Sequence, residues 1–278
     1  MKTQCWKRIM CALAASAALI GGPGAALAAD ADSDGIDDSV ESTGAGITFG
    51  GTNYPPCSGT PLPGAARNAR VSPTSKDIFV YLVTKSGGGF LQQNGLIAPE
   101  VLFQFITAAS TATPKGLGVG VHVSRVDTAV SSTSRGVGTL GQKAVQIIAD
   151  ENPSSFVFGA ADQGTPSATG DATVYPVKIR DYVVNGGGAE ADWKKFIKRT
   201  FSHELSHVAA LTALYDSRYG GHHYATGSGV VMDQSVVYNS KRKTFTIPEN
   251  YAAGDNPCLL AVNTANPLQC IGFPPVIP

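Results

Sequence analysis

The residues best suited to chemistry are the histidines, because four of the five in this 278-residue chain fall between positions 203 and 223. His203, Glu204 and His207 form an HExxH sequence. In a helix, two histidines four positions apart project from the same face, where they can hold a divalent metal. So short a motif also arises by chance, and the alternative is a helix whose histidines only cap it or form hydrogen bonds. Two further histidines and a downstream Met232 favour the metal site.

The third metal ligand must come from beyond the helix. Catalytic zinc typically takes three protein ligands and leaves the fourth place to water. Gly220 and Gly221 break the helix just before His222 and His223, so the chain can turn back there. Neighbouring residues of an extended segment point in opposite directions, so one of this pair can ligate. We favour His223, with His222 as the alternative; a surface loop without metal is the third interpretation.

Glu204 lies about 100° round the helix from His203, beside the metal but not among its ligands. There it can take a proton from zinc-activated water and deliver it to the leaving amine. The expected activity is hydrolysis of peptide bonds by a secreted zinc endopeptidase. Tyr224 or Tyr219 is a candidate hydrogen-bond donor to the oxyanion.

A long helix is predicted to carry these residues. Between residues 190 and about 214, apolar side chains recur with helical spacing at positions 193, 196, 197, 201, 205, 208 and 211. Glu190 and Asp192 suit the positive end of the helix dipole. Both imidazoles therefore belong to the second half of a stiff helix with one buried stripe.

A sheet is predicted beside this helix. Residues 77–83 and 118–123 are apolar runs of strand length, and Pro99 opens a segment that predicts a helix to about Ser110 between them. This order predicts a crossover connection, a partly parallel sheet and an α/β fold. We expect His122 on the surface of its strand and not at a metal, because lone histidines are usually not ligands.

Three further strands are expected, at residues 144–148, 155–158 and 172–180. Pro176 places the last of them at an edge of the sheet. An edge strand beside a metal site can hold an extended peptide by main-chain pairing, so this strand is the predicted substrate shelf. Residues 235–238 and 243–247 predict a short helix and a strand of a small C-terminal lobe.

A second candidate site lies near the N-terminus. Oxygen-bearing side chains occupy positions 1, 3, 5, 9 and 12 of a calcium-loop pattern, with glycine at position 6. The expected Ca²⁺ ligands are the side chains of Asp30, Asp32, Asp34, Asp38 and Glu41 and the carbonyl of Ile36. The alternative is a disordered acidic leader. The loop resembles the DxDxDG repeats of thrombospondin type 3 proteins, which implies a stabilising ion and not a signalling one.

Residues 1–28 are typical of a secretory signal cut near Ala28. Three basic residues precede an apolar run at residues 9–20, and small residues follow it. The run is too short to span a bilayer, so we expect a secreted or periplasmic protein without a membrane anchor. Removing the signal leaves a net charge near −3. Basic residues form no cluster, which argues against nucleic-acid binding.

The rest of the chain divides into an extension at residues 29–75 and a catalytic domain with its C-terminal lobe at residues 76–278. From residue 42 the extension is rich in Gly, Pro and Ser, which indicates a linker or an extended wrap. A propeptide is equally compatible with it. We expect a disulfide between Cys258 and Cys270, with a bridge from Cys57 to either as the alternative.

HELSHVAAL, a later histidine and the Met232 of VVMDQ resemble the metzincin clan of zinc endopeptidases. The resemblance covers about residues 76–240 and implies a Met-turn beneath the metal. It also implies a twisted mixed sheet with an antiparallel edge strand over a long active-site helix, and a small irregular C-terminal lobe. The chain departs from the HExxHxxGxxH pattern, since Ala210 replaces the glycine and Ala213 replaces the third ligand. The third histidine therefore follows a longer spacer.

Two other functions are compatible with these residues. A calcium-stabilised extracellular binding or adhesion module would hold a metal without turnover, and a zinc hydrolase could act on non-peptide amides. For the endopeptidase, the expected partner is a peptide or protein substrate. No signal for oligomerisation is visible.

Overall fold

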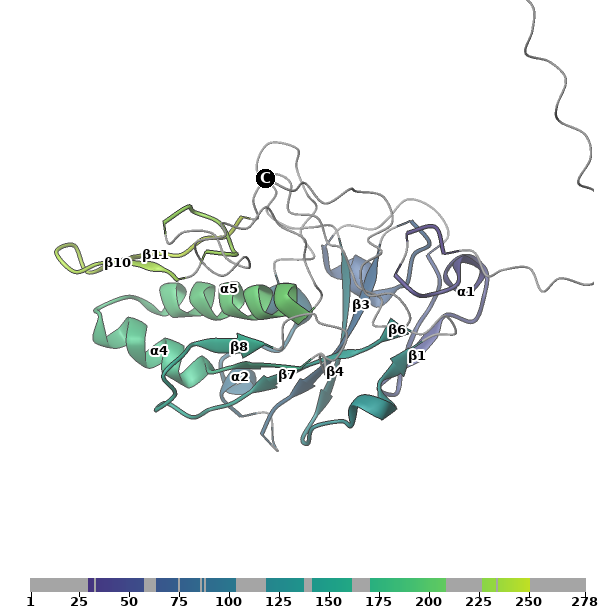
Figure 1. Ribbon diagram of the computed structural model, residues 1–278, viewed down its shortest axis with the longest axis horizontal. Coiled ribbons are helices and arrows are strands. Elements are labelled where there is room, and N and C mark those ends of the chain that lie inside the picture. The colour runs from purple at the N-terminus through teal and green to yellow at the C-terminus, as the bar shows by residue number, and fades with distance from the viewer. Residues whose placement is uncertain are drawn as a thin grey trace, which may run out of the picture.

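The computed structural model (Figure 1) describes residues 30–32, 34–57, 64–74, 76–85, 87, 89–103, 119–137, 142–161, 171–208, 227–233 and 235–250. Its centre is a five-stranded sheet in the order β4-β3-β7-β9-β8. The strands are β3 (Asp77–Val83), β4 (Gly120–Val126), β7 (Val145–Ala149), β8 (Gly159–Ala161) and β9 (Asp171–Val174). All neighbours are parallel except β8, which pairs antiparallel with β9 at the edge. The expected α/β fold with a mixed sheet is confirmed.

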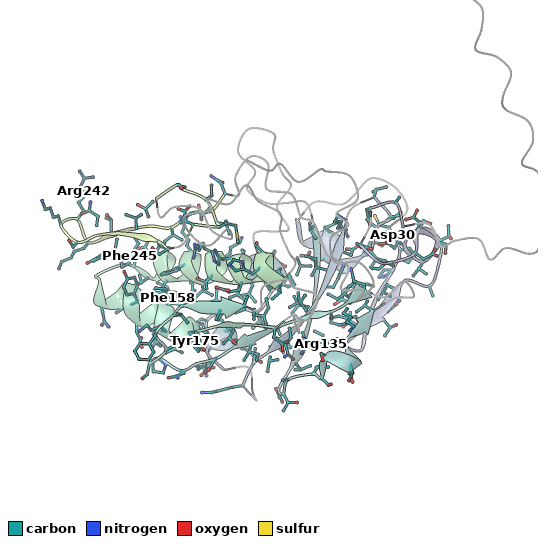
Figure 2. The ribbon with its side chains drawn as sticks, viewed as in Figure 1. Asp30, Arg135, Phe158, Tyr175, Arg242 and Phe245 are labelled. Carbon is teal, nitrogen blue, oxygen red and sulfur yellow. The ribbon has the colours of Figure 1, made fainter. Side chains whose placement is uncertain are left out.

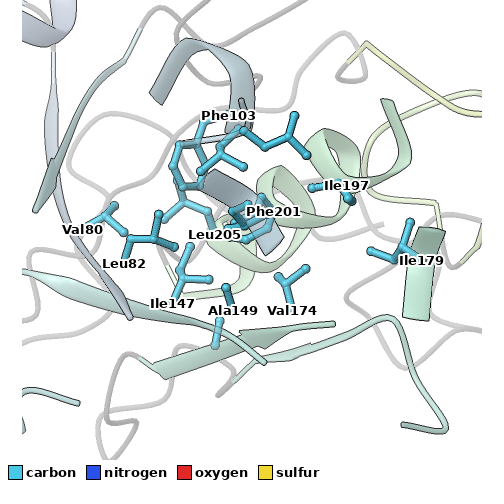
Figure 3. Close-up of a cluster of buried hydrophobic side chains, with 14 of the residues drawn as sticks. Val80, Leu82, Phe103, Ile147, Ala149, Val174, Ile179, Ile197, Phe201 and Leu205 are labelled. Carbon is cyan, nitrogen blue, oxygen red and sulfur yellow. The ribbon is translucent and has the colours of Figure 1, made fainter. Parts of the chain in front are cut away.

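Helix α5 (Glu190–Val208) covers one face of the sheet, and helix α4 (Pro176–Asn185) packs against α5. Alternate residues of β3, Ile78, Val80 and Leu82, point to this face and join the larger hydrophobic core. Phe201 and Leu205 of α5 fill the same core, and Figure 3 shows them against Leu82 and the β7 side chains. The predicted apolar stripe of the long helix is therefore its sheet-facing side.

The opposite face is covered by the N-terminal arm, which we define as residues 30–57. The arm contains α1 (Asp38–Ser42), β1 (Ile47–Phe49) and β2 (Thr52–Tyr54), and Figure 1 shows it at the other end of the sheet from α4. Phe49 packs edge-on against Phe79 of β3 with ring centroids 5.1 Å apart. The described part of this extension packs against the sheet, and whether it is also a propeptide stays open. Both faces of β3 are thus buried, which explains its nearly uninterrupted apolar sequence.

Shorter elements complete the fold. Three short helices connect the larger elements: α2 (Gly89–Gln93), α3 (Pro99–Leu102) and the 3₁₀ turn at Ser132–Ser134. A further 3₁₀ helix spans Gly64–Ala69. Two small hairpins pair β5 (Gly136–Val137) with β6 (Gln142–Lys143) and β10 (Val237–Asn239) with β11 (Thr244–Thr246). No helix in the described part of the chain is long and apolar enough to cross a membrane.

Two predicted strands differ from the structure. Residues 155–158 form bends, because side chains of this segment bind their own backbone: Asn152 Oδ1 accepts the Ser154 amide and Ser155 Oγ accepts the Val157 amide. Residues 172–180 are split, since β9 ends at Val174 and Pro176 is the first residue of α4. The amide of the first residue of a helix makes no bond within the helix, so a proline without an amide hydrogen fits there. Pro176 therefore starts a helix and does not mark an edge strand. The strand at this edge of the sheet is β8, and β4 is at the other edge.

The two short predicted helices also differ. The segment opening at Pro99 is helical only to Leu102, and Phe103 is extended and fully buried against Phe201 of α5; residues 104–110 lie outside the described residues. Residues 235–238 contribute to strand β10 and not to a helix, because Val237 and Tyr238 are strand formers that pair with β11. The strand predicted at 243–247 is present as β11.

His122 is fully buried, so the prediction of a surface residue is wrong. It does face away from the helix side of the sheet, but the arm covers that face: its ring lies 4.7 Å from Phe79 and 4.4 Å from Tyr54. Its Nε2 lies 2.6 Å from Asp77 Oδ1 and its Nδ1 2.9 Å from the Asn68 carbonyl.

The arm should fold as one unit with the central sheet. Phe49→Ala should lower the free energy of unfolding in urea by about 3 kcal/mol, because Phe49 is 4% exposed in the second core. Phe156→Ala is the matched control: that ring is wholly exposed, and its loss should change stability by less than about 0.5 kcal/mol. Equal, small effects would show that the arm does not pack on the sheet in solution.

Candidate functional site

Helix α5 places the HExxH residues inside the protein. The apolar stripe of the helix faces the sheet, and every residue from Arg199 to Ser206 is buried. Polar hydroxyls in this part bond within the helix: Ser202 Oγ donates to the Lys198 carbonyl and Ser206 Oγ donates to the Ser202 carbonyl. The polar groups that remain for function are therefore His203, Glu204 and His207.

His203 is held in one orientation by the loop after the helix. Its Nδ1 lies 3.0 Å from the backbone carbonyl oxygen of Val231. A carbonyl can only accept, so Nδ1 carries the proton and, in the neutral ring, Nε2 presents a lone pair. Such an outer hydrogen bond is what fixes the tautomer of a metal-binding histidine.

His203 and His207 converge on one point. Their Nε2 atoms are 3.1 Å apart, and their rings are nearly perpendicular with centroids 4.7 Å apart. Two imidazole nitrogens at this distance must share either a proton or a cation. Tetrahedral zinc with Zn–N bonds of 2.0–2.1 Å sets two ligand nitrogens about 3.3 Å apart, so the pair fits two ligands of one zinc ion.

Glu204 lies next to this pair and against the sheet edge. Burial raises the pKa of Glu204 to about 8, whereas the charge of Arg199 acts in the opposite direction. The space for the carboxylate exists because residue 159 of β8 is a glycine: a Cβ there would come within 2.3 Å of Glu204 Oε1. A carboxylate, two imidazoles and a strand edge thus meet at one place.

The turn around Met232 is fastened to α5 at two points. Arg199 Nη2 donates to the Asp233 carbonyl, and His203 bonds to the Val231 carbonyl. Because the two helix residues are four apart, they lie on the same face and bind alternate carbonyls of the turn. Met232 between them is fully buried in the larger core.

Several predicted site residues lie outside the described residues. These are the two candidate third ligands, His222 and His223, and the candidate oxyanion donors, Tyr219 and Tyr224. Cys258 and Cys270 also lie outside them, and Cys57 is buried in the arm. The third ligand and the disulfide stay predictions.

The acidic loop gathers part of its predicted ligand set. Oxygens of Asp30, Asp32 and Asp34 lie within 4.8 Å of one another. The Asp38 carboxylate instead accepts the Ala31 amide at 2.9 Å, and the Ile36 side chain is in the second core. Burial and the neighbouring carboxylates raise the pKa of Asp32 to about 7 and that of Asp34 to about 9.

Four residues at these two places were not identified from the sequence. Arg199, Gly159 and the Val231 carbonyl complete the histidine site, and Asp77 of β3 joins the acidic loop. Only Arg199 had a local signal, since it precedes His203 by one helical turn. The others are brought in by tertiary contacts between segments far apart in the chain.

Comparison with known proteins adds one weak likeness. No family model and no curated protein matches this sequence. Among solved structures, archaemetzincin from Methanopyrus kandleri aligns with 13% identity and a TM-score of 0.32, over 68% of this chain and 92% of that one. Values this low establish neither a common fold nor a common activity.

The contact between β8 and Glu204 can be tested through stability. Gly159→Ala should destabilise the protein by about 1–3 kcal/mol, because the new methyl group overpacks the buried Glu204 side chain. Gly136→Ala is the control, since a Cβ there meets no atom within 4 Å.

In a Glu204→Ala background the clash disappears, so the effect of Gly159→Ala should fall below about 0.5 kcal/mol. Urea unfolding of the four-member cycle measures the coupling. If Gly159→Ala lowered stability equally in the unmodified protein and in Glu204→Ala, the added methyl group would clash with a residue other than Glu204.

Proposed function

We propose that this protein is a zinc-dependent hydrolase that cleaves peptide bonds. The observation that carries the proposal is the 3.1 Å approach of the His203 and His207 Nε2 atoms beside the buried carboxyl group of Glu204. A zinc ion held there would polarise the scissile carbonyl and lower the pKa of water. The resemblance of the HExxH and Met232 segments to metzincins supports the same reaction.

Glu204 is the proposed general base. It lies between His203 and His207 on the same helix. Because its side chain is buried, water does not compete for its hydrogen bonds. In the forward step its carboxylate accepts a proton from the attacking water, and it then passes this proton to the leaving amine. Arg199, one turn away, holds the turn around Met232 and does not reach the reacting atoms in this proposal.

Strand β8 is the proposed binding site for an extended substrate. It pairs with β9 on one side, and in the described part of the chain its other side pairs with no strand. Its residues, Gly159 to Ala161, are small, so the main chain is open to pairing with a peptide. Since Gly159 touches Glu204, a peptide on this edge would bring a carbonyl next to the base.

The residue before β8 fixes where this edge lies. Phe158 packs between the two helices, with its ring 5.0 Å from Tyr182 of α4 and 4.8 Å from Phe196 of α5 (Figure 2). Phe156, two residues earlier, is wholly exposed. The proposal keeps His223 or His222 as the third ligand and export through residues 1–28.

The general base is tested with zinc-loaded full-length protein on an unfolded protein substrate. Glu204→Gln should lower the cleavage rate by about 10²-fold or more, because the amide cannot accept the proton. Glu190→Gln is the matched control: it lies on the same helix, its side chain is 68% exposed, and it loses only a surface ion pair with Lys194. Its rate should equal that of the unmodified protein.

The same assay separates the other functions. Equal rates for Glu204→Gln and the unmodified protein would contradict the proposed base. Binding of zinc without cleavage of any peptide would favour the non-catalytic binding module. Cleavage restricted to a panel of non-peptide amides would leave the zinc chemistry in place but change the substrate class.

A further inference from the structure

A second cluster of carboxylates lies where the N-terminal arm crosses the start of β3. Oxygens of Asp34, Glu41 and Asp77 lie within 4.8 Å of one another, and none of the three side chains is exposed. Asp34 also belongs to the group formed with Asp30 and Asp32. The cluster thus joins two parts of the chain that are more than thirty positions apart.

The Glu41 carboxylate has no hydrogen-bond partner among the described residues. Both of its oxygens are buried. Asp32 Oδ2 is likewise buried and accepts no hydrogen bond from any described residue. An unpaired carboxylate in the protein interior is strongly unfavourable, so such groups are normally paired or coordinate a metal.

Arg67 and His122 contact Asp77, and the charge of the nearby Lys76 acts on Asp30, Asp32 and Asp34. Arg67 Nη1 lies 2.7 Å and His122 Nε2 2.6 Å from Asp77 Oδ1, and the Ser72 amide donates to Asp77 Oδ2 at 2.9 Å. These contacts fix the Asp77 carboxylate from the side of the sheet. Its remaining lone pairs can face Glu41 and Asp34 across the cluster.

We propose that Asp34, Glu41 and Asp77, supported by Asp32 and Asp30, bind one Ca²⁺ ion that fastens the N-terminal arm to β3. All of the side-chain ligands are hard carboxylate oxygens, which favour calcium or magnesium over zinc. Oxygens on opposite sides of Ca²⁺ are at most about 5 Å apart at bond lengths of 2.3–2.6 Å, in line with the observed cluster. Magnesium needs a stricter octahedron and keeps several waters, which a buried site with this many carboxylates does not favour.

The site differs from a self-contained calcium loop because one ligand comes from the sheet. The Asp77 amide donates to Asp34 Oδ2 at 2.7 Å, and Gln142 Nε2 donates to the carbonyls of both Asp34 and Asp77. The Glu41 carbonyl accepts the Cys57 amide at 3.1 Å, at the far end of the arm. An ion at this junction therefore holds the loop, α1 and the end of β2 onto the outer face of the sheet, and this holds whether or not the α5 site is a peptidase.

The test uses full-length protein that has been stripped of metal, reloaded with zinc and titrated with CaCl₂. We expect one Ca²⁺ per chain by calorimetry and a rise of several degrees in the melting temperature. Glu41→Gln should weaken calcium affinity by about tenfold or more, because one charged ligand is lost. Asp37→Asn is the matched control: its carboxylate is in the same loop but caps α1 through Ser39, a role that asparagine also fills, so affinity should be unchanged.

No calcium-dependent heat and no change in melting temperature would overturn the proposal and leave a proton-sharing carboxylate cluster. An equal loss of calcium affinity in Asp37→Asn and Glu41→Gln would also overturn it, because Ca²⁺ would then be attracted only by the overall charge of the acidic loop. These readouts do not involve hydrolysis, so their failure is distinct from failure of the proposed peptidase activity.

The position of the ion at Asp77 needs a separate measurement, because Asp77→Asn also disturbs Arg67 and His122 and can prevent folding. Tb³⁺ in place of Ca²⁺ emits when a nearby tyrosine is excited. Tyr54 packs edge-on against His122, which contacts Asp77, so Tyr54→Phe should remove much of this emission. Tyr238→Phe in the distant β10 hairpin should leave it unchanged. Equal emission from both variants would exclude an ion at the start of β3.

Discussion

The hydrogen bond between His203 Nδ1 and the Val231 carbonyl is the contact on which the candidate active site depends. It gives the imidazole a fixed orientation and leaves the other ring nitrogen facing His207. The carbonyl is available only because the turn around Met232 is itself held, by Arg199 and by the burial of Met232 in the core. The helix and the turn thus position each other: the helix supplies two side chains four residues apart, and the turn supplies the two acceptors.

The central sheet connects this site to the acidic cluster. Successive residues of β3 point to opposite faces, so Val80 and Leu82 support α5 while Asp77 and Phe79 meet the arm. The arm is therefore a structural layer, and the Ca²⁺ site we propose would stabilise the strand next to β7, on which α5 also rests.

Local patterns predicted the parts of the fold whose environment is uniform. The continuous apolar run at 77–83 became β3 with the same bounds. The helix predicted from residue 190 to about 214 is present as α5 up to Val208, and the remaining residues lie outside the described part of the chain. The pattern failed where a side chain acted on its own backbone or where a second layer changed the environment. Ser155 and Asn152 turned an apolar run into bends, Pro176 began a helix, and the arm buried His122.

The candidate sites were predictable to a similar extent. The spacing of His203, Glu204 and His207 was sufficient to place them together, because a helix fixes their relation. Gly159, the Val231 carbonyl and Asp77 could not be found in this way, since each reaches its site through tertiary packing over long sequence separations. The third ligand depends on a segment outside the described residues.

Zinc analysis of the full-length protein and its single histidine variants is the most direct test of the central claim. The account predicts one zinc ion per chain in the unmodified protein, in His122→Gln and in one of the two variants His222→Ala and His223→Ala. It predicts clear loss of zinc in His203→Ala, in His207→Ala and in the other member of that pair. Full zinc content in His203→Ala or His207→Ala would contradict the metal site on α5.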